Sequence, residues 1–288
     1  MRLALLAFIL SVLPAPATAE NLRGGGKLLL TGGVSSVEGA AGGGLASWAL
    51  IAGDETDAGI GGGAHASIVA LDDFTLTSMG AKIGFFDRLE LSYARQRFDT
   101  RDAGATLGLG RGYMLGQHVM GAKLRLIGDA VYDQDRLVPQ ISVGVSHKIA
   151  DKPTLIKALG GGSRSGTEFY LAATKVLLAQ SLVVDATARL TNANQTGLLG
   201  FGGDRQSSRT VQFEGSLGWL ASRRLLIGGE YRTKPDNLGF ASEGNAWDLF
   251  AAYAINRHLS ATAAFVDMGA IATFKRQRGA YLSLQTSF

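Results

Sequence analysis

The sequence predicts an all-β protein, a single closed antiparallel β-barrel that spans a membrane, and three observations predict it. Segments of about ten residues alternate between apolar and polar side chains. Their connections alternate between very short and long, and the alternation of the last segment continues to the final residue, Phe288. Bacterial outer-membrane barrels combine these features, with tight turns at the periplasmic end and longer loops outside the cell.

The N-terminal segment is typical of a secretory signal peptide. Arg2 gives it a positive start, residues 3–13 form an apolar core, and Ala17-Thr18-Ala19 is a small-residue cleavage site. A membrane-spanning helix needs roughly 20 apolar residues, so the core is too short for an anchor. We therefore expect a cleaved signal peptide at residues 1–19 and one outer-membrane β-barrel domain at residues 20–288. Such a chain is exported through the periplasm to the bacterial outer membrane.

The composition argues against several classes of protein. The chain of 288 residues has a formal net charge of +4, or +3 once Arg2 is removed, and its basic residues form no single run, so we expect no nucleic-acid partner. It has no cysteine, and no two of its 4 histidines share the spacing of a metal site. Its glycine runs open no helical pattern of the kind that binds nucleotides. We expect no metal and no cofactor.

The alternation is clearest in the C-terminal half of the chain. In TVQFEGSLGWL, residues 210–220, Phe213 and Trp219 fall on one face of a strand and Glu214 falls on the other. A water-soluble β-sandwich would also alternate in this way. The barrel is favoured because Trp219, Trp247 and Tyr231 lie near predicted strand ends, where aromatic girdles of barrels meet the membrane interfaces.

The connections supply the second signal. Very short turns are expected at residues 87–88, 179–180, 221–222 and 256–257, with a somewhat longer one at residues 128–136. Longer polar or glycine-rich loops fall between them, at residues 99–112, 150–166, 192–208, 234–245 and 267–277. This alternation places the two kinds of connection at opposite ends of the barrel.

Closure of the sheet sets the number of strands. A sheet in lipid cannot leave an open edge, so the last strand must pair with the first. Counting back from Phe288 in the periplasm makes residues 45–52 a strand that begins outside the cell, and residues 27–35 are then needed as an earlier strand. The sequence predicts about 14 strands, with about 12 as the nearest alternative.

The end of the chain carries a general resemblance. Leu282, Leu284 and Phe288 share one face of the last strand with Thr286. This pattern resembles the signal by which the barrel assembly machinery recognises outer-membrane proteins, although Thr286 departs from its more apolar form. The resemblance implies that Phe288, Leu284 and Leu282 form the assembly signal. It also implies that the assembly machinery and outer-membrane lipid are partners of the chain.

A second resemblance is more particular. The stretches GGKLLLTGGVSSVEGAAGGGL, residues 25–45, and FDRLELSYARQRFDT, residues 86–100, resemble a proteobacterial outer-membrane barrel family known only as a domain of unknown function. The similarity extends over most of the mature chain. It implies the fold and the location, and it supplies no substrate and no catalytic residue.

Charged residues of both signs are expected on the strand faces that point into the barrel. The proposed lumen-lining residues are Glu90, Lys123, Arg125, Asp185, Arg189, Glu214, Glu230, Arg232 and Asp248. They would either line a water-filled channel or pair across the barrel and plug it. The width of the barrel favours a channel or transporter for small solutes, because side chains fill only barrels of about eight strands. Passive conduction is not expected if the N-terminal glycine-rich segment or a long loop folds inward.

Two other functions stay open. A lipid or ester hydrolase would need a histidine, an acid and a nucleophile at the outer rim. The candidates are His118, Asp99, Asp102, Ser163 and Ser165. No nucleophile motif accompanies them, so we expect no enzyme. A structural or adhesive barrel would bind a partner through its outer loops, where residues 197–203 offer an apolar contact.

Overall fold

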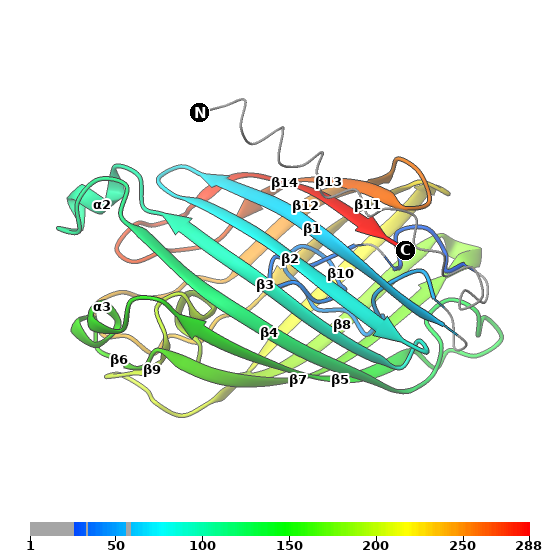
Figure 1. Cartoon of the computed structure of the whole chain (residues 1–288), viewed down its shortest axis with the longest axis horizontal. Helices are drawn as coiled ribbons and strands as arrows, with labels where there is room; N and C mark the ends of the chain where they lie inside the picture. Colours follow the sequence, from blue (N-terminus) through cyan, green and yellow to red (C-terminus); the bar gives the residue numbers. More distant parts are fainter. Residues whose placement is uncertain (1–25, 33, 56–58) are drawn as a thin grey trace.

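The computed structural model describes residues 26–32, 34–55 and 59–288, and the predicted signal peptide lies outside these residues. Within them the chain folds as a closed antiparallel β-barrel (Figure 1). No helix in the described ranges is long and apolar enough to cross a membrane.

The described part of the chain contributes twelve strands to the barrel wall. In chain order these are β1 (Ile60–Leu71), β2 (Thr75–Phe85), β3 (Leu89–Asp99), β4 (Met114–Ile127), β5 (Gln140–Ala150), β7 (Ser165–Leu177), β8 (Leu182–Thr191), β10 (Thr210–Ser222), β11 (Leu225–Arg232), β12 (Ala246–Ala254), β13 (Leu259–Asp267) and β14 (Arg278–Ser287). Each wall strand pairs with the next wall strand along the chain, and β1 pairs with β14 to close the ring.

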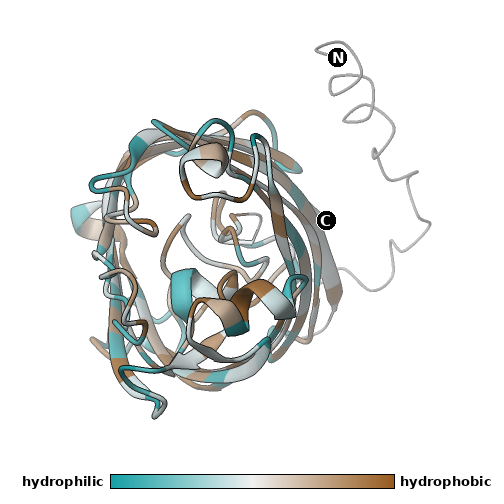
Figure 2. Ribbon diagram, turned by 90° about the vertical axis from the view of Figure 1, so that its left-hand side faces the viewer, coloured by the Kyte–Doolittle hydropathy of each residue, from teal (hydrophilic) through white to brown (hydrophobic). Residues whose placement is uncertain are grey.

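The two ends of the barrel differ in their connections. One end, here called the loop end, carries the helices α2 (Ala103–Thr106), α3 (Pro153–Ala158) and η3 (Asn194–Gly197) and a small sheet of β6 (Gly161–Ser163) and β9 (Phe201–Gly203). Figure 1 shows α2 and α3 at the opposite end from the C-terminus. Viewed from the loop end, short helices lie over the mouth of the ring (Figure 2). The other end, here called the turn end, holds mostly short connections, including η2 (Leu178–Gln180), and the longer one between β4 and β5; the short turn between β1 and β2 lies at the loop end.

The last strand is ordered to its end because it closes the barrel. In the pair of β1 with β14, Gly63 lies opposite Ser287 and Leu71 opposite Gly279. Phe288 extends this ladder by one step, since its amide donates to the Gly62 carbonyl at 3.0 Å and its carbonyl accepts from the Gly62 amide at 3.0 Å. Backbone groups that would otherwise form an open edge are therefore paired.

The prediction of about 14 strands is wrong, and the alternative of 12 matches the structure. Residues 45–52 and the described part of residues 27–35 do not join the wall. Ala46, Trp48 and Ile51 are at most 2% exposed, and the residues between them are buried as well. A wall strand would expose every second side chain to lipid. Burial of successive side chains therefore indicates a segment that lies inside the barrel.

The wall has an apolar outside and a polar inside. On β10, Phe213 is 61% exposed and its neighbour Glu214 is 4% exposed; on β12, Leu249 is 61% exposed and Asp248 is 3% exposed. A water-soluble sandwich would bury the apolar face, whereas a barrel in a membrane turns it toward lipid. The charged side chains are thus directed inward, where each needs a partner.

Candidate functional site

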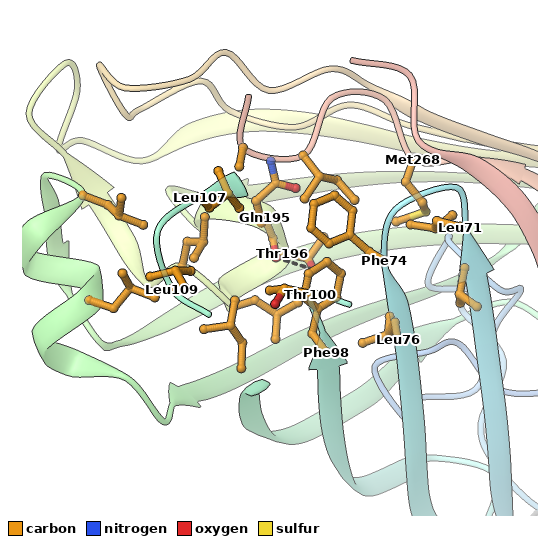
Figure 3. A pocket seen from close by; sticks show the side chains of 18 of the residues that line it. Leu71, Phe74, Leu76, Phe98, Thr100, Leu107, Leu109, Gln195, Thr196 and Met268 are labelled. Atoms are coloured by element: carbon orange, nitrogen blue, oxygen red, sulfur yellow. Dashed lines mark hydrogen bonds between the residues drawn. The ribbon is translucent and has the colours of Figure 1, made fainter. Parts of the chain in front are cut away.

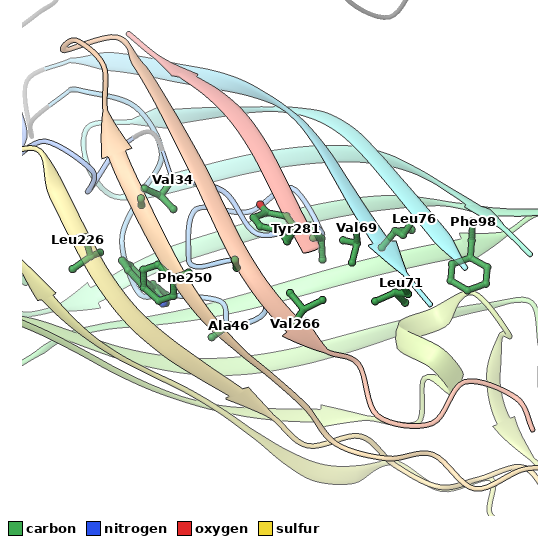
Figure 4. Packing of buried hydrophobic residues seen from close by; sticks show 14 of the residues in the cluster. Val34, Ala46, Val69, Leu71, Leu76, Phe98, Leu226, Phe250, Val266 and Tyr281 are labelled. Atoms are coloured by element: carbon green, nitrogen blue, oxygen red, sulfur yellow. The ribbon is translucent and has the colours of Figure 1, made fainter. Parts of the chain in front are cut away.

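The interior of the barrel is filled by a segment of the chain itself. Residues 34–55, here called the plug, run inside the ring of strands, and Figure 4 shows Val34 and Ala46 of this segment among side chains that point inward from the wall. Trp48 is 2% exposed and donates its indole N–H to the Ser216 hydroxyl on β10 at 2.8 Å. The plug is rich in glycine and alanine, so much of its hydrogen bonding with the wall involves its backbone.

Carboxylates of the wall accept hydrogen bonds from the backbone amides of the plug. The pairs are Ala41 N and Glu90 at 3.1 Å, Ala52 N and Glu90 at 2.9 Å, Leu45 N and Glu230 at 2.8 Å, and Ser47 N and Glu214 at 2.9 Å. Hydrogen bonds to an ionised acceptor are roughly twice as strong as those between neutral groups. They also satisfy amides that burial would otherwise leave unpaired.

Cations of the wall bind the carbonyl groups of the plug. Lys123 on β4 donates to the carbonyls of Ala41 at 2.9 Å and Leu50 at 2.7 Å. Lys82 on β2 donates to the carbonyl of Val34 at 2.5 Å. Both signs of charge on the wall therefore match the two kinds of backbone group that the plug presents.

Glu38 is a buried charge that the plug itself supplies. Its carboxylate lies 2.8 Å from Lys148 Nζ, 2.9 Å from Arg232 Nη2 and 3.9 Å from Arg189 Nη1. Burial alone would raise the pKa of Glu38, but the positive charges, first of all that of Arg232, outweigh it and hold the pKa well below its usual range. Glu38 is therefore ionised, and it joins three strands of the wall to the plug.

A second group of charges lies at the turn end, where the chain enters the barrel. Lys27 Nζ is 2.8 Å from Asp87 and 3.6 Å from Glu55, and it donates to the carbonyl of Ile51 at 2.8 Å. Burial raises the pKa of Glu55 to about 7, and the positive charge of Lys27 offsets only part of this effect. Glu55 thus titrates near neutral pH at the end of the plug.

Most of the predicted lumen-lining residues lie against the plug. Those with a hydrogen bond or ion pair to it are Glu90, Lys123, Arg189, Glu214, Glu230 and Arg232. All six are buried. Their role as the lining of a solute path stays a prediction.

The other three predicted residues have different surroundings. Asp185 accepts a hydrogen bond from Thr174 at 2.5 Å, and Asp248 lies directly across the sheet from Glu230. Arg125 lies at the turn end, where it pairs with Asp87 and donates to the carbonyl of Gly128 at 2.8 Å. Of these three residues, Asp185 and Asp248 are buried in the interior and Arg125 is not.

Sequence reasoning missed Lys82, Lys148, Glu168 and Glu38. The three wall residues follow the same alternation as the predicted ones: in β2, for example, Ile83 is 38% exposed and Lys82 is 4% exposed. Applied to every strand, the period of two would have found them. Glu38 has no comparable signal, because the segment around it was assigned to no strand with two distinct faces.

Within the described ranges, no hydrogen bond joins His118 to a candidate serine or to a candidate aspartate. His118 points outward from β4, and its Nδ1 lies 2.8 Å from the hydroxyl of Tyr93 on β3. Ser163 donates to the carbonyl of Ser165 at 2.8 Å, and Asp102 pairs with an arginine of its own loop at 2.5 Å. The described residues also include no group of three or more histidine, aspartate or glutamate side chains that could hold a metal ion.

A cavity of about 210 Å³, here called the outer pocket, lies at the loop end (Figure 3). Its strand-end lining includes Leu71, Phe74, Leu76, Phe98 and Leu115. Its loop lining includes Leu107, Leu109, Leu155, Leu198 and Met268, and a few polar groups, among them Thr196 and Lys234, complete it. The rings of Phe74 and Phe98 stack with their centroids 5.1 Å apart. No plug residue belongs to this lining, so the pocket and the plug are separate features.

The fold and the filled interior define a porin-like outer-membrane β-barrel with an internal plug. The chain belongs to the family described as "Protein of unknown function (DUF3034)", whose model matches residues 31–285. The family resemblance predicted from residues 25–45 and 86–100 is therefore confirmed.

Solved porin structures share the barrel fold. The KdgM porin superposes with a TM-score of 0.51 and 12% identity, covering 78% of this chain and 99% of that chain. A KdgM porin in complex with disordered oligogalacturonate gives 0.52 and 12% with the same coverage, and the NanC porin gives 0.50 and 8%, covering 79% of this chain and 98% of that chain. At these identities the similarity shows the fold. No curated protein matches the chain in sequence.

Proposed function

We propose that this chain is a channel or transporter for small solutes in the bacterial outer membrane, and that the plug closes it. The observation that carries the proposal is the way the plug is held. Wall charges of both signs, such as Glu90 and Lys123, bind its backbone through hydrogen bonds. The same charges would line the lumen once the plug moved.

Polar contacts of this kind are compatible with reversible displacement of the plug. Water can replace each hydrogen bond between the wall and the plug, because the net free energy of such a bond is only about 1 kcal/mol, or 1.5–3 kcal/mol where a charge takes part. The charged side chains of the wall would lose their partners in the plug, but water in the lumen would hydrate them. The plug also packs apolar side chains against the wall, among them Val34, Trp48 and Leu50, and its displacement would expose them to water at a cost that grows with their area.

The size of the barrel supports a path behind the plug. Side chains alone fill a barrel of about eight strands, and this wall has twelve. The backbone and side chains of the plug occupy the interior space that the side chains of the wall leave. Displacement of the plug would therefore open a lumen of mixed charge, which favours small solutes.

The surface of the wall supports the location and the partners that the proposal includes. Large apolar side chains such as Phe213 and Leu249 cover the outside and would contact outer-membrane lipid. The last strand, with Leu282, Leu284 and Phe288, would be the segment that the barrel assembly machinery recognises. We propose no nucleic-acid partner, because a barrel in the outer membrane has little access to one.

A reversible cross-link between the plug and the wall tests the proposal. The Ala49 amide donates to the Thr174 hydroxyl at 2.7 Å, and the chain has no native cysteine, so the double variant Ala49→Cys, Thr174→Cys can form only the intended disulfide. It is made together with Glu38→Gln, which removes the ion pairs of Glu38 with Lys148, Arg189 and Arg232 and should raise the frequency of openings in planar bilayers at least tenfold over the native protein. We expect the oxidised form to be silent and the reduced form to conduct.

The controls are the Glu38→Gln protein with native Ala49 and Thr174, with and without reductant. Silent bilayers in all forms, together with no solute uptake in liposome swelling, would contradict a channel. That result would instead favour a structural or adhesive barrel.

A further inference from the structure

The side chains that line the outer pocket are mostly apolar, and several of them are buried although they border a cavity. Leu71, Phe74 and Phe98 are 5%, 1% and 6% exposed, and Figure 3 shows them turned toward a common space together with loop residues. Protein interiors are normally packed to the density of organic crystals. Apolar atoms that border a void lose the dispersion contacts that neighbours would supply. An occupant of matching chemistry would restore them.

The size and polarity of the cavity limit the occupant. Water needs two to four polar partners, and apolar cavities of ~150 Å³ stay dry and take up benzene. The outer pocket, at about 210 Å³, has room for a substituted aromatic ring or a short hydrocarbon chain.

We propose that the outer pocket is a binding site for a small apolar molecule, such as a monocyclic aromatic compound or a short hydrocarbon. Strand ends of β1–β4 form one side of the site, and loops that follow β3, β5, β8, β11 and β13 form the other. The site is therefore rigid on the side of the wall and adaptable on the side of the loops. Because few groups of the lining are polar, the ligand does not need to carry a charge.

One lining residue connects the pocket with the plug. The carbonyl of Thr196 accepts hydrogen bonds from Lys148 at 3.0 Å and from Gln117 at 3.2 Å, and the same Lys148 ammonium donates to Glu38 of the plug at 2.8 Å. Gln195 and Thr196 have φ values of 45° and 57°, in the left-handed region that non-glycine residues rarely adopt. Contacts with neighbours therefore hold this loop in place.

A ligand that moves the loop of Thr196 would change the surroundings of Lys148 and hence its pair with Glu38. In this way an occupied pocket would favour displacement of the plug. This step rests on the proposed function, since it needs a plug that moves. Binding itself does not, so the test below measures binding alone and can succeed or fail independently of conduction.

The test uses the mature barrel, refolded in detergent micelles, and 4-fluorotoluene as the probe in ¹⁹F NMR. Probe dissolved in the micelles gives one resonance, and probe in the pocket should give a second that saturates at one equivalent of protein. Leu115→Trp fills the pocket from β4 and should weaken binding at least tenfold. Met114→Trp adds the same ring to the adjacent position, which is 42% exposed on the lipid side, and should leave binding unchanged.

Heat-modifiable migration on gels shows that each variant is folded. If Leu115→Trp does not fold, Leu109→Trp fills the same pocket from the loop that contains α2 and serves in its place. A saturable resonance that is lost only in the pocket variants supports the site. Absence of that resonance, or equal loss in Met114→Trp, would overturn it.

Discussion

At the scale of single residues, Gly43 shows how closely the plug backbone approaches the wall. A Cβ atom at this position would overlap the carboxylate of Glu230. That carboxylate has little freedom to move, because it accepts hydrogen bonds from the Leu45 amide at 2.8 Å and from the Ser216 hydroxyl at 2.7 Å. Glycine at position 43 is therefore a condition for seating the plug.

The variant Gly43→Ala should loosen the plug without unfolding the barrel. We expect several-fold more openings in planar bilayers, because the added methyl group must push Glu230 away from its two donors. Gly44→Ala is the matched control, since its Cβ would lie 3.4 Å from the nearest Glu230 oxygen, an ordinary contact. Equal opening frequencies in the two variants would contradict this account.

Glu55 should make seating of the plug depend on pH. In the seated plug burial raises the pKa of Glu55 to about 7 from 4.5, so the carboxyl keeps its proton over a range in which a hydrated glutamate has lost it. Below pH 4.5 both states hold the proton and seating has its full strength. Between pH 4.5 and 7 Glu55 loses its proton only in the displaced state, which lowers the free energy of that state relative to the seated plug by about 3 kcal/mol at most. Above pH 7 Glu55 is deprotonated in both states, so this free-energy difference no longer changes with pH.

Open probability should therefore rise between pH 5 and pH 7 in planar bilayers and change little above. Glu55→Gln should remove this dependence. Glu243→Gln is the control: burial also raises the pKa of Glu243 to about 7, but Glu243 lies in the loop between β11 and β12, beside Lys234, and not in the plug. An unchanged pH profile in Glu55→Gln would show that another group is responsible.

At the scale of elements, the wall strands were predictable and the plug was not. A strand between lipid and a polar interior must alternate, and β10 does so, with Phe213 outward and Glu214 inward. Residues 45–52 lack that alternation, since they are surrounded by protein on all sides. Their apolar composition suited either a strand or a buried segment, and periodicity alone does not separate the two.

The inward charges could have indicated that a segment of the chain fills the barrel, but the number of strands was predicted without them. Charges of both signs inside a barrel need partners, and Glu90 and Lys123 find theirs in the plug backbone as well as in each other, at 3.3 Å. The sequence thus predicted many of the inward charges of the wall, although not Lys82, Lys148 or Glu168, and it did not predict which segment they bind. The outer pocket was beyond prediction, because its lining combines the ends of β1–β4 with five loops whose relative positions depend on the closed ring.

The last strand should be needed more for assembly than for any activity. Phe288 supplies the final backbone step of the closing pair, and its carbonyl also accepts from the Asp54 amide of the plug at 3.1 Å. Deleting Phe288 removes these bonds together with an apolar ring at the lipid face, so we expect a large loss of folded barrel in membranes. Phe288→Ala keeps the backbone bonds and should assemble better than the deletion. Normal heat-modifiable migration of the truncated protein would refute this expectation.

At the scale of the whole molecule, three groups of residues follow one another along the barrel. Lys27 and Glu55 hold the plug at the turn end, Glu38 pairs with wall cations in the interior, and the outer pocket lies beyond it at the loop end. Lys148 belongs to the second group and touches the third through Thr196. A signal that reaches the plug from the loop end therefore has a short physical route.

This arrangement predicts that 4-fluorotoluene opens the channel and that Lys148 transmits the effect. We expect the probe to raise open probability several-fold in the native protein and not in Leu115→Trp, which also controls for any effect of the probe on the bilayer. Lys148→Met should still bind the probe in ¹⁹F NMR, because Lys148 is not part of the pocket lining. Its openings should respond more weakly, because the direct link from Thr196 to Glu38 is lost and only the longer route through Gln117 and Gln96 to the Val37 carbonyl remains among the described residues. A full response in Lys148→Met would place the coupling elsewhere, whereas binding with no response in the native protein would separate the pocket from the plug altogether.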